Sequence, residues 1–278
     1  MSEPVALAVA AHPDDIEFMM TGTLLLLGQA GYKLHMINLA SGCCGSMDEN
    51  RQIIATRRLA EAREAARVVG AKLHDPIADD VEVFYTRELI QKMCAVVRVA
   101  RPTIMLLPSP EDYMEDHMTS SRLAVTAAFV RGMPNFLTAP PRNPTSQPVT
   151  LYHALPYGLR DGMRRVVLPG QFVDITSVLK DKRAALACHT SQKEWLDKTQ
   201  GVDSYLDTME SMSQEVGRWS TVYPYAEGWR RHSHLGFCDE SADPLTEALG
   251  DKVLTSVAYE RELKQDPLRA MKRYRQRS

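Results

Sequence analysis

Residues 5–17, VALAVAAHPDDIE, contain the transition that decides the fold. The apolar run Val5 to Ala11 is typical of a buried strand, and the apolar stretch 18–27 is long enough for a helix. Between the two lie one imidazole and two carboxylates, those of His12, Asp14 and Asp15. These groups are therefore predicted at the carboxyl end of a strand, where open α/β sheets bind their ligands.

The residue types at this turn suit a metal site. A neutral imidazole and a carboxylate are good ligands for zinc or another first-row divalent metal. If His12 and Asp15 hold the metal, Asp14 remains beside it as the free base that a metal hydrolase needs. Alternatively, Asp14 is a helix N-cap and Glu17 closes a capping box, which leaves His12 without a role. A third ligand elsewhere in the chain would favour the metal.

Strand and helix patterns alternate through the first half of the chain. Apolar periodicity predicts helices at 51–69, 86–100 and 119–131. Apolar runs predict five strands, at 5–11, 33–40, 72–74, 103–107 and 150–155. This alternation implies an α/β fold with a doubly wound, mostly parallel sheet flanked by helices. The common strand order for such a core is 3-2-1-4-5.

His117 supplies the third candidate ligand. It follows the predicted fourth strand, and in the order 3-2-1-4-5 that strand lies beside the first. His12, Asp15 and His117 would then converge on one crevice. Three protein ligands with an open fourth position are typical of a catalytic metal site. The alternative for His117 taken alone is an exposed loop histidine.

Composition narrows the class of protein. The chain has 278 residues, a formal net charge of −2 and a pI near 6.5, which argues against nucleic acid as the main partner. Its five cysteines lack the spacing of a disulfide framework, which fits a reducing compartment. No apolar run is long enough for a membrane span, and the N-terminus lacks a signal-peptide pattern. We expect a cytoplasmic protein with no membrane partner.

The segment Ala11 to Glu17, followed by Thr21-Gly22-Thr23, resembles the signature of the PIG-L/LmbE-type deacetylases. These zinc-dependent enzymes remove an acetyl group from N-acetylglucosamine units. Further matches follow in the family's order: Arg58-Leu59-Ala60-Glu61, Asp112, Asp116-His117, Asp174-Ile175-Thr176-Ser177, His189-Thr190-Ser191-Gln192 and Tyr225-Ala226-Glu227. The resemblance covers about residues 4–230 and implies a Rossmann-like fold. We expect one α/β deacetylase-like domain over 1–235 and a C-terminal extension of unknown role over 236–278.

The resemblance also implies roles for single residues. The metal ligands it implies are His12, Asp15 and His117, with Asp14 as the general base. Asp116 would hold the site from behind the ligands, as metal sites usually require. Arg58 falls near the family's substrate-contacting arginine, although a solvated arginine on an exposed helix face is equally compatible with its position. The implied cofactor is Zn²⁺ or another divalent first-row metal. The implied substrate is a small N-acetylated amino sugar, and the implied assembly is a homo-oligomer, a trimer or hexamer.

Two positions depart from the family pattern. Met114 stands where the family has a histidine that stabilises the intermediate's oxygen or assists the leaving amine. Loss of one such donor typically costs ~10² to 10³ in turnover. Tyr113 and His153 are candidates to replace it at the substrate, together with His189, His232 and His234. In addition, Ser41-Gly42-Cys43 replaces a family loop that carries an acid.

These departures keep two other functions open. One is an amidohydrolase that acts on a non-sugar N-acyl substrate with the same machinery. The other is a catalytically weak or silent metal-containing binding protein, which would bind zinc tightly and release no acetate.

Overall fold

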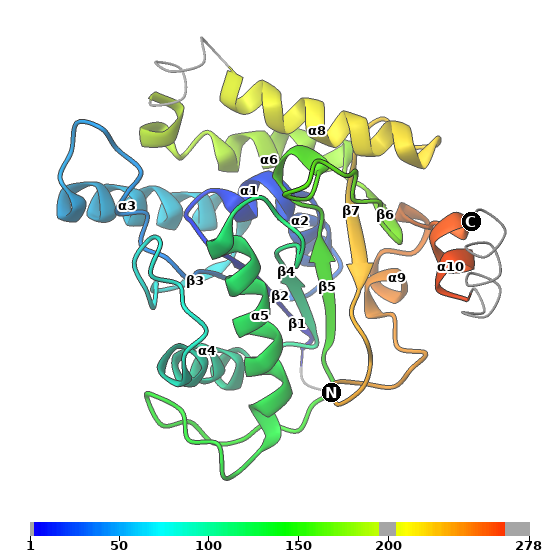
Figure 1. Ribbon diagram of the computed structural model, residues 1–278. Coiled ribbons are helices and arrows are strands. Elements are labelled where there is room, and N and C mark those ends of the chain that lie inside the picture. Colours follow the sequence, from blue (N-terminus) through cyan, green and yellow to red (C-terminus); the bar gives the residue numbers. More distant parts are fainter. Residues whose placement is uncertain (1–2, 195–203, 265–278) are drawn as a thin grey trace, which may run out of the picture.

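The structure is a computed structural model that describes residues 3–194 and 204–264 (Figure 1). Its centre is an eight-stranded sheet in the order β3-β2-β1-β4-β5-β7-β6-β8. The first five strands in this order are parallel. They are β1 (Val5–Ala10), β2 (Lys33–Asn38), β3 (Lys72–His74), β4 (Ile104–Leu107) and β5 (Thr150–Ala154). The predicted α/β class and the core order 3-2-1-4-5 are confirmed.

Three antiparallel strands extend the sheet beyond β5. They are β7 (Ala226–Arg231), β6 (Gln171–Asp174) and β8 (Val253–Thr255). The short helix α9 (Pro244–Leu249) buries Leu245 and Leu249 against the core behind them. Within the segment 236–278, which we expected as an extension, residues 244–255 therefore add a helix and an edge strand to the same sheet. The helix α10 (Val257–Leu263) follows, and the basic tail beyond it lies outside the described residues.

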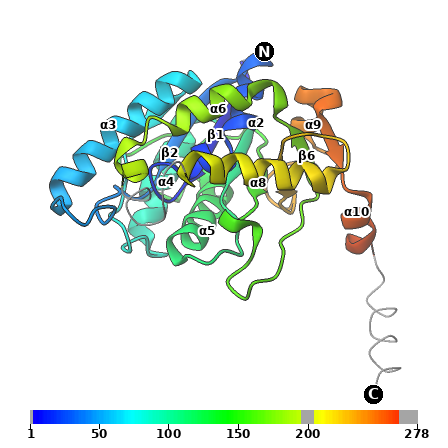
Figure 2. The same ribbon diagram turned by 90° about the horizontal axis from the view of Figure 1, so that it is seen from above.

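Helices cover both faces of the sheet (Figures 1 and 2). One layer contains α2 (Thr21–Gln29), α3 (Arg51–Val69), α6 (Leu179–Leu186) and α8 (Ser204–Ser220). The other contains α4 (Arg87–Ala100) and α5 (Glu115–Phe129). Side chains alternate along β1, so Ala8 faces the α2 layer while Leu7 and Val9 pack against α4 and α5. Both layers thus bury the strand that leads into His12.

The helix expected over 18–27 is two helices, α1 (Asp15–Met19) and α2, which meet at Met20. The first free amides of α2, those of Gly22 and Thr23, donate to the Glu227 carboxylate at 2.8 and 2.7 Å. A Cβ at Gly22 would lie 2.8 Å from that carboxylate, so only glycine permits this approach. The Thr21-Gly22-Thr23 and Tyr225-Ala226-Glu227 segments therefore form one contact. The break comes from this long-range cap, which apolar periodicity does not reveal.

The other helix boundaries follow local signals with two corrections. α3 and α4 begin after the N-caps Asn50 and Thr86, and Gly70 ends α3 with a positive φ of 76°. The helix expected from Thr119 begins at Glu115, so His117 lies in its first turn. The late helix expected to run to about residue 195 is interrupted after α6, and its last position lies outside the described residues. The helix expected over 202–219 is α8, whose described part begins at 204.

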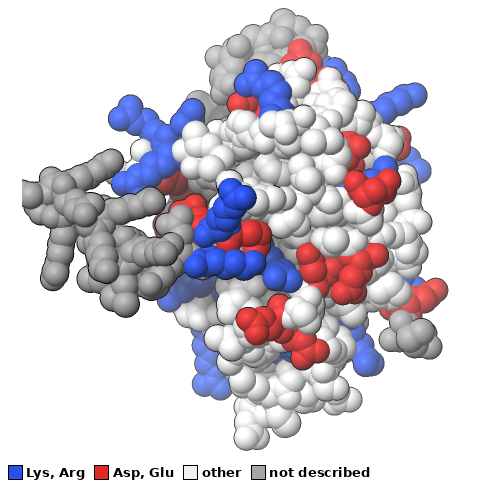
Figure 3. All heavy atoms as spheres, turned by 90° about the vertical axis from the view of Figure 1, so that its right-hand side faces the viewer, with Lys and Arg blue, Asp and Glu red and all other residues white. Residues whose placement is uncertain are grey.

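One face of the molecule carries both acidic and basic side chains. Figure 3 shows acidic and basic side chains in separate small groups on one face, without a continuous basic area among its described residues. None of the helices within 3–194 and 204–264 is long and apolar enough to cross a membrane.

Candidate metal centre and active site

The carboxyl ends of β1 and β4 bring His12, Asp15 and His117 together. His12 follows β1, Asp15 begins α1, and His117 lies in the first turn of α5 after β4. One ligand atom from each of the three lies within 4.8 Å of the other two. All three line a cavity of about 340 Å³, and both histidines are buried. The convergence that the strand order predicted is therefore present.

The distances between these atoms fit a tetrahedral metal. Asp15 Oδ2 lies 3.5 Å from His12 Nδ1 and 3.4 Å from His117 Nε2. These distances are long for hydrogen bonds. Zinc–nitrogen and zinc–oxygen bonds of 2.0–2.1 Å in a tetrahedron separate neighbouring ligand atoms by about 3.4 Å. The two distances from Asp15 Oδ2 are therefore those expected if one zinc or other first-row divalent ion lies between Asp15 and both rings.

Carboxylates hold the remaining ring nitrogen of each histidine. His12 Nε2 is 3.1 Å from Asp116 Oδ2, and His117 Nδ1 is 3.0 Å from Asp112 Oδ1. Asp116 is fixed in turn, because its Oδ2 accepts a 2.7 Å hydrogen bond from the Val81 amide. Metal-binding histidines commonly have such a partner, which orients the ring and raises its basicity. The structure thus places the Asp116 carboxylate against the His12 ring and the Asp112 carboxylate against the His117 ring.

The local field favours a cation. Burial lowers the pKa of His12, but the hydrogen bonds to Asp116 and Asp15 outweigh it and raise that pKa to about 10. For Asp15, burial raises the pKa, and the nearby His117 and His12 more than reverse this and lower it. A positive charge at this position is therefore stabilised whether a proton or a metal supplies it.

Asp14 is held beside the three ligands but apart from them. Its backbone has a φ of 114°, a left-handed conformation that is rare for a residue with a side chain. Its Oδ2 accepts a 2.8 Å hydrogen bond from the Tyr205 hydroxyl, and its Oδ1 lies 3.3 Å from the Arg58 guanidinium. Burial raises the pKa of Asp14, and Arg58 opposes that shift. The carboxylate is thus fixed, desolvated and basic.

The capping alternative for this turn lacks its defining bond. Asp14 occupies the N-cap position of α1, but its side chain accepts no hydrogen bond from the helix amides. Glu17 is fully buried, and its carboxylate lies 3.4 Å from His189 Nε2 instead of reaching back to the N-cap amide. The alternative for Arg58 is also wrong, because this side chain is only 4% exposed and donates to the Pro13 carbonyl as well.

Aromatic rings form the wall of the cavity. Tyr113 and Met114, both predicted near the substrate, line it together with Phe18, Tyr157 and Tyr205. The Phe18 ring packs edge-on against Tyr205 and Tyr157, with centroids 5.0 and 5.4 Å apart. The sequence did not predict the rings of Phe18, Tyr157 and Tyr205 at the site. It also did not predict the lining residues Cys44, Asp80 and Gln192. Among them only Gln192 lies in a quoted motif, so a signal existed for that residue alone.

His153 is placed outside this cavity. Its Nδ1 lies 2.9 Å from the Pro108 carbonyl, and its Nε2 lies 3.0 Å from His232 Nδ1. Burial lowers the pKa of His153 to about 4, so the ring is neutral at pH 7. These contacts are those of a buried histidine that ties β5 to the end of β4.

The lowered pKa of His153 predicts how stability depends on pH. The unfolded chain binds this proton near pH 6.5 and the folded protein only near pH 4. The contribution of the neutral His153 ring to the free energy of unfolding is fully present above pH 6.5. It is lost as pH falls toward 4, by up to about 3 kcal/mol. When the pH is lowered from 6.5 to 4, the free energy of unfolding should fall less for His153→Gln than for wild type. Urea titrations at each pH measure this difference. Parallel pH profiles for the two proteins would contradict this.

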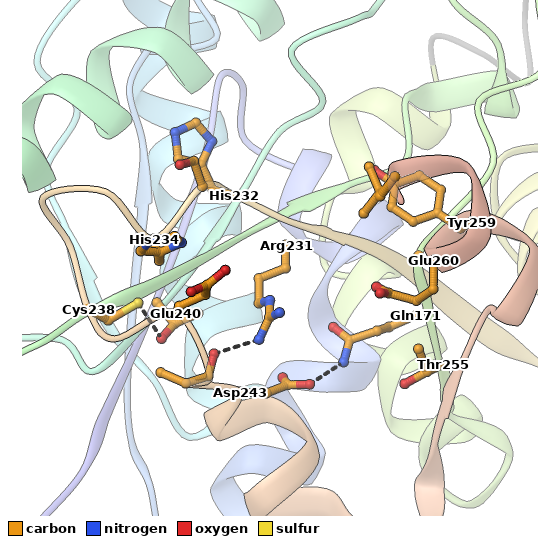
Figure 4. Close-up of a pocket in the computed structure, with 15 residues that line it drawn as sticks. Gln171, Arg231, His232, His234, Cys238, Glu240, Asp243, Thr255, Tyr259 and Glu260 are labelled. Atoms are coloured by element: carbon orange, nitrogen blue, oxygen red, sulfur yellow. Dashed lines mark hydrogen bonds between the residues drawn. The ribbon is translucent and has the colours of Figure 1, made fainter. Parts of the chain in front are cut away.

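A second cavity lies between β7 and α10 (Figure 4). It has a volume of about 530 Å³ and includes His232, His234 and Glu260. Several of its polar groups are already bonded: Gln171 donates to Asp243 at 2.6 Å, and Arg231 donates to the Ala242 carbonyl at 2.8 Å. None of the predicted metal ligands lines it. The smaller cavity at Asp14 therefore remains the candidate active site.

Comparison with known proteins agrees with this fold. A family model described as PIG-L, GlcNAc-PI de-N-acetylase, matches residues 7–128, which include most of β1, all of β2 to β4 and most of α5. The protein is similar to diacetylchitobiose deacetylase from Thermococcus kodakarensis, with 31% identity over 196 residues that cover 67% of this chain and 69% of that enzyme. This chain belongs to the PIG-L family of deacetylases, as its motifs predicted.

Two further similarities show the breadth of the fold. A 4-oxalmesaconate hydratase from Pseudomonas putida is 27% identical over 204 residues, which cover 68% of this chain and 74% of that protein. The structure of N,N'-diacetylchitobiose deacetylase from Pyrococcus horikoshii superposes with a TM-score of 0.70 at 24% identity, covering 84% of this chain and 85% of that one. The second similarity is evidence for the fold alone.

Proposed function

We propose that this protein is a metal-dependent hydrolase that removes the acetyl group from an N-acetylglucosamine-type substrate. The observation that carries the proposal is the convergence of His12, Asp15 and His117 beside the separate, partly buried carboxylate of Asp14. Membership of a deacetylase family and the similarity to a diacetylchitobiose deacetylase support the choice of substrate.

The chain's own groups divide the chemistry between them. Zn²⁺ held by His12, Asp15 and His117 would supply Lewis acidity, which would polarise the amide carbonyl and lower the pKa of a water toward ~7. Asp14 takes the proton of the attacking water and later delivers it to the leaving amine. Tyr205 and Arg58 aim the two oxygens of Asp14 while it does so. The products are acetate and a free amine.

Tyr113 is our candidate to replace the donor that Met114 lacks. Both residues line the cavity, whereas His153 does not. A tyrosine phenol loses its proton only near pH ~10, so the Tyr113 hydroxyl stays protonated at neutral pH and can donate to a developing oxyanion. The substrate would be a small N-acetylated amino sugar. A cytoplasmic location and a trimeric or hexameric assembly stay predictions.

A second candidate activity is hydration of a small non-amide substrate. Met114 at the active-site wall and the similarity to a hydratase favour it. The same base and the same metal ligands would then activate water toward a carbon–carbon double bond instead of an amide.

Metal removal tests the first proposal. The full chain, reconstituted with Zn²⁺, is expected to release acetate from N-acetylglucosamine or N,N'-diacetylchitobiose. A chelator should abolish release, and Zn²⁺ in excess of the chelator should restore it. His117→Ala should lose both bound zinc and acetate release. Turnover of simple N-acyl amines without any N-acetyl sugar would favour the non-sugar amidohydrolase. Tight zinc with no hydrolysis would contradict the deacetylase and leave the hydratase or the silent binding protein.

A further inference from the structure

Two adjacent thiols lie at the edge of the candidate active site, and the proposed mechanism uses neither. Cys43 and Cys44 belong to the loop between β2 and α3, and both are free thiols. Cys43 is buried and Cys44 is exposed. Their sulfur atoms are 4.0 Å apart. Cys44 lines the same cavity as His12.

A buried carboxylate completes the group. One ligand atom from each of Cys43, Cys44 and Asp80 lies within 4.8 Å of the others. Asp80 follows β3 and accepts hydrogen bonds from the Gly42 amide at 2.6 Å and from the Cys44 amide at 2.7 Å, one on each oxygen. An ionised carboxylate offers about four lone-pair positions, so it can still bind a cation.

The loop that carries the two thiols packs tightly against the Arg58 side chain. Arg58 lies so close that a Cβ at Gly42 would be 2.7 Å from its Cδ and a Cβ at Gly45 would be 2.5 Å from its Nη1. Asp80 fixes the same loop from the side through the two amides. The backbone that carries the two cysteines is therefore held by Arg58 and by Asp80.

We propose that Cys43, Cys44 and Asp80 form a second metal site, for a thiophilic divalent cation such as Zn²⁺ or Cd²⁺. Zinc–sulfur bonds of 2.3 Å in a tetrahedron separate two sulfur atoms by about 3.8 Å, close to the 4.0 Å found here. Thiolate ligands select this class of metal, in contrast to the imidazole and carboxylate set of the first site. Binding releases the two thiol protons to solvent. The inference does not depend on the deacetylase activity.

Metal binding by the reduced full-length chain tests the proposal. Cd²⁺ is titrated under anaerobic conditions, bound metal is counted after dialysis, and the thiolate-to-Cd²⁺ charge-transfer band is followed in the ultraviolet. The double variant Cys43→Ser/Cys44→Ser should bind one ion fewer per chain than wild type and lack the band. Cys188→Ser, which removes a half-buried thiol on another element, should match wild type. Circular dichroism of every variant checks that it is folded.

A second variant separates the two sites. His117→Ala, which disables the first site, should keep the charge-transfer band and lose one ion. The proposal is overturned if the folded double serine variant binds as many ions as wild type. It is also overturned if Cys188→Ser loses the band, or if the reduced wild type shows no band at saturating Cd²⁺.

Discussion

Replacing Asp14 with asparagine is expected to remove most turnover while the metal stays bound. Asparagine has nearly the same shape and tolerates the left-handed backbone, so the fold at this turn should survive. Its amide is not a base, and positioned general bases contribute typically 10² to 10⁴ in rate. Acetate release should therefore fall by about that factor, with unchanged zinc per chain.

The control for this variant is Asp75→Asn. Asp75 is an aspartate whose side chain is 80% exposed and pairs with Arg63, and neither residue lines the cavity. This variant should keep the wild-type rate. Undiminished turnover in Asp14→Asn would rule out Asp14 as the base, and loss of zinc would show that Asp14 holds the metal instead.

Replacing Glu227 with leucine is expected to give the largest loss of stability. Glu227 and Lys182 are both fully or nearly buried and form an ion pair, and among the described residues the other partner of Lys182 Nζ is the Phe18 carbonyl, at 2.8 Å. Leucine leaves that ammonium uncompensated and frees the two α2 amides that Glu227 caps. Breaking a buried ion pair in this way typically costs about 3–5 kcal/mol in free energy of unfolding.

The partner variant makes this prediction sharper. Lys182→Met leaves the Glu227 carboxylate with its two amide donors at the positive end of α2, so it should cost less than Glu227→Leu. Glu64→Leu, which breaks the exposed Glu64–Arg67 pair, should change stability little. Denaturant titrations of the three variants measure the order. Equal losses for Glu227→Leu and Glu64→Leu would contradict the role of the buried pair.

Much of this site could be predicted because it depends on strand ends. His12 and His117 each follow an apolar strand, and a parallel sheet brings the carboxyl ends of neighbouring strands together. The helix that starts at Glu115 instead of Thr119 did not disturb this, because a difference of one turn leaves His117 at the same edge. The capping alternative also arose from sequence alone, and the side-chain positions of Asp14 and Glu17 decided against it.

The rest depends on packing that no local pattern records. Tyr205 comes from α8, and its position on an apolar helix face is that of an ordinary core residue. Asp80 follows a three-residue strand in a loop without regular structure. Glu227 caps a helix about two hundred residues earlier in the chain, a contact set by the antiparallel strands that we did not predict. Sequence periodicity locates elements, but which distant side chains meet is decided by how those elements pack.

The left-handed backbone at Asp14 makes activity the first property that this protein should lose on heating. A residue persists in such a conformation only while its surroundings hold it there, at a cost of about 1–3 kcal/mol. The hydroxyl of Tyr205 and the guanidinium of Arg58 are the groups that hold this side chain. If α8 loosens, the turn can relax and misdirect its carboxylate while every strand of the sheet stays paired. A sample could then look native by circular dichroism and be inert in the assay, so storage life is better judged by turnover than by secondary structure.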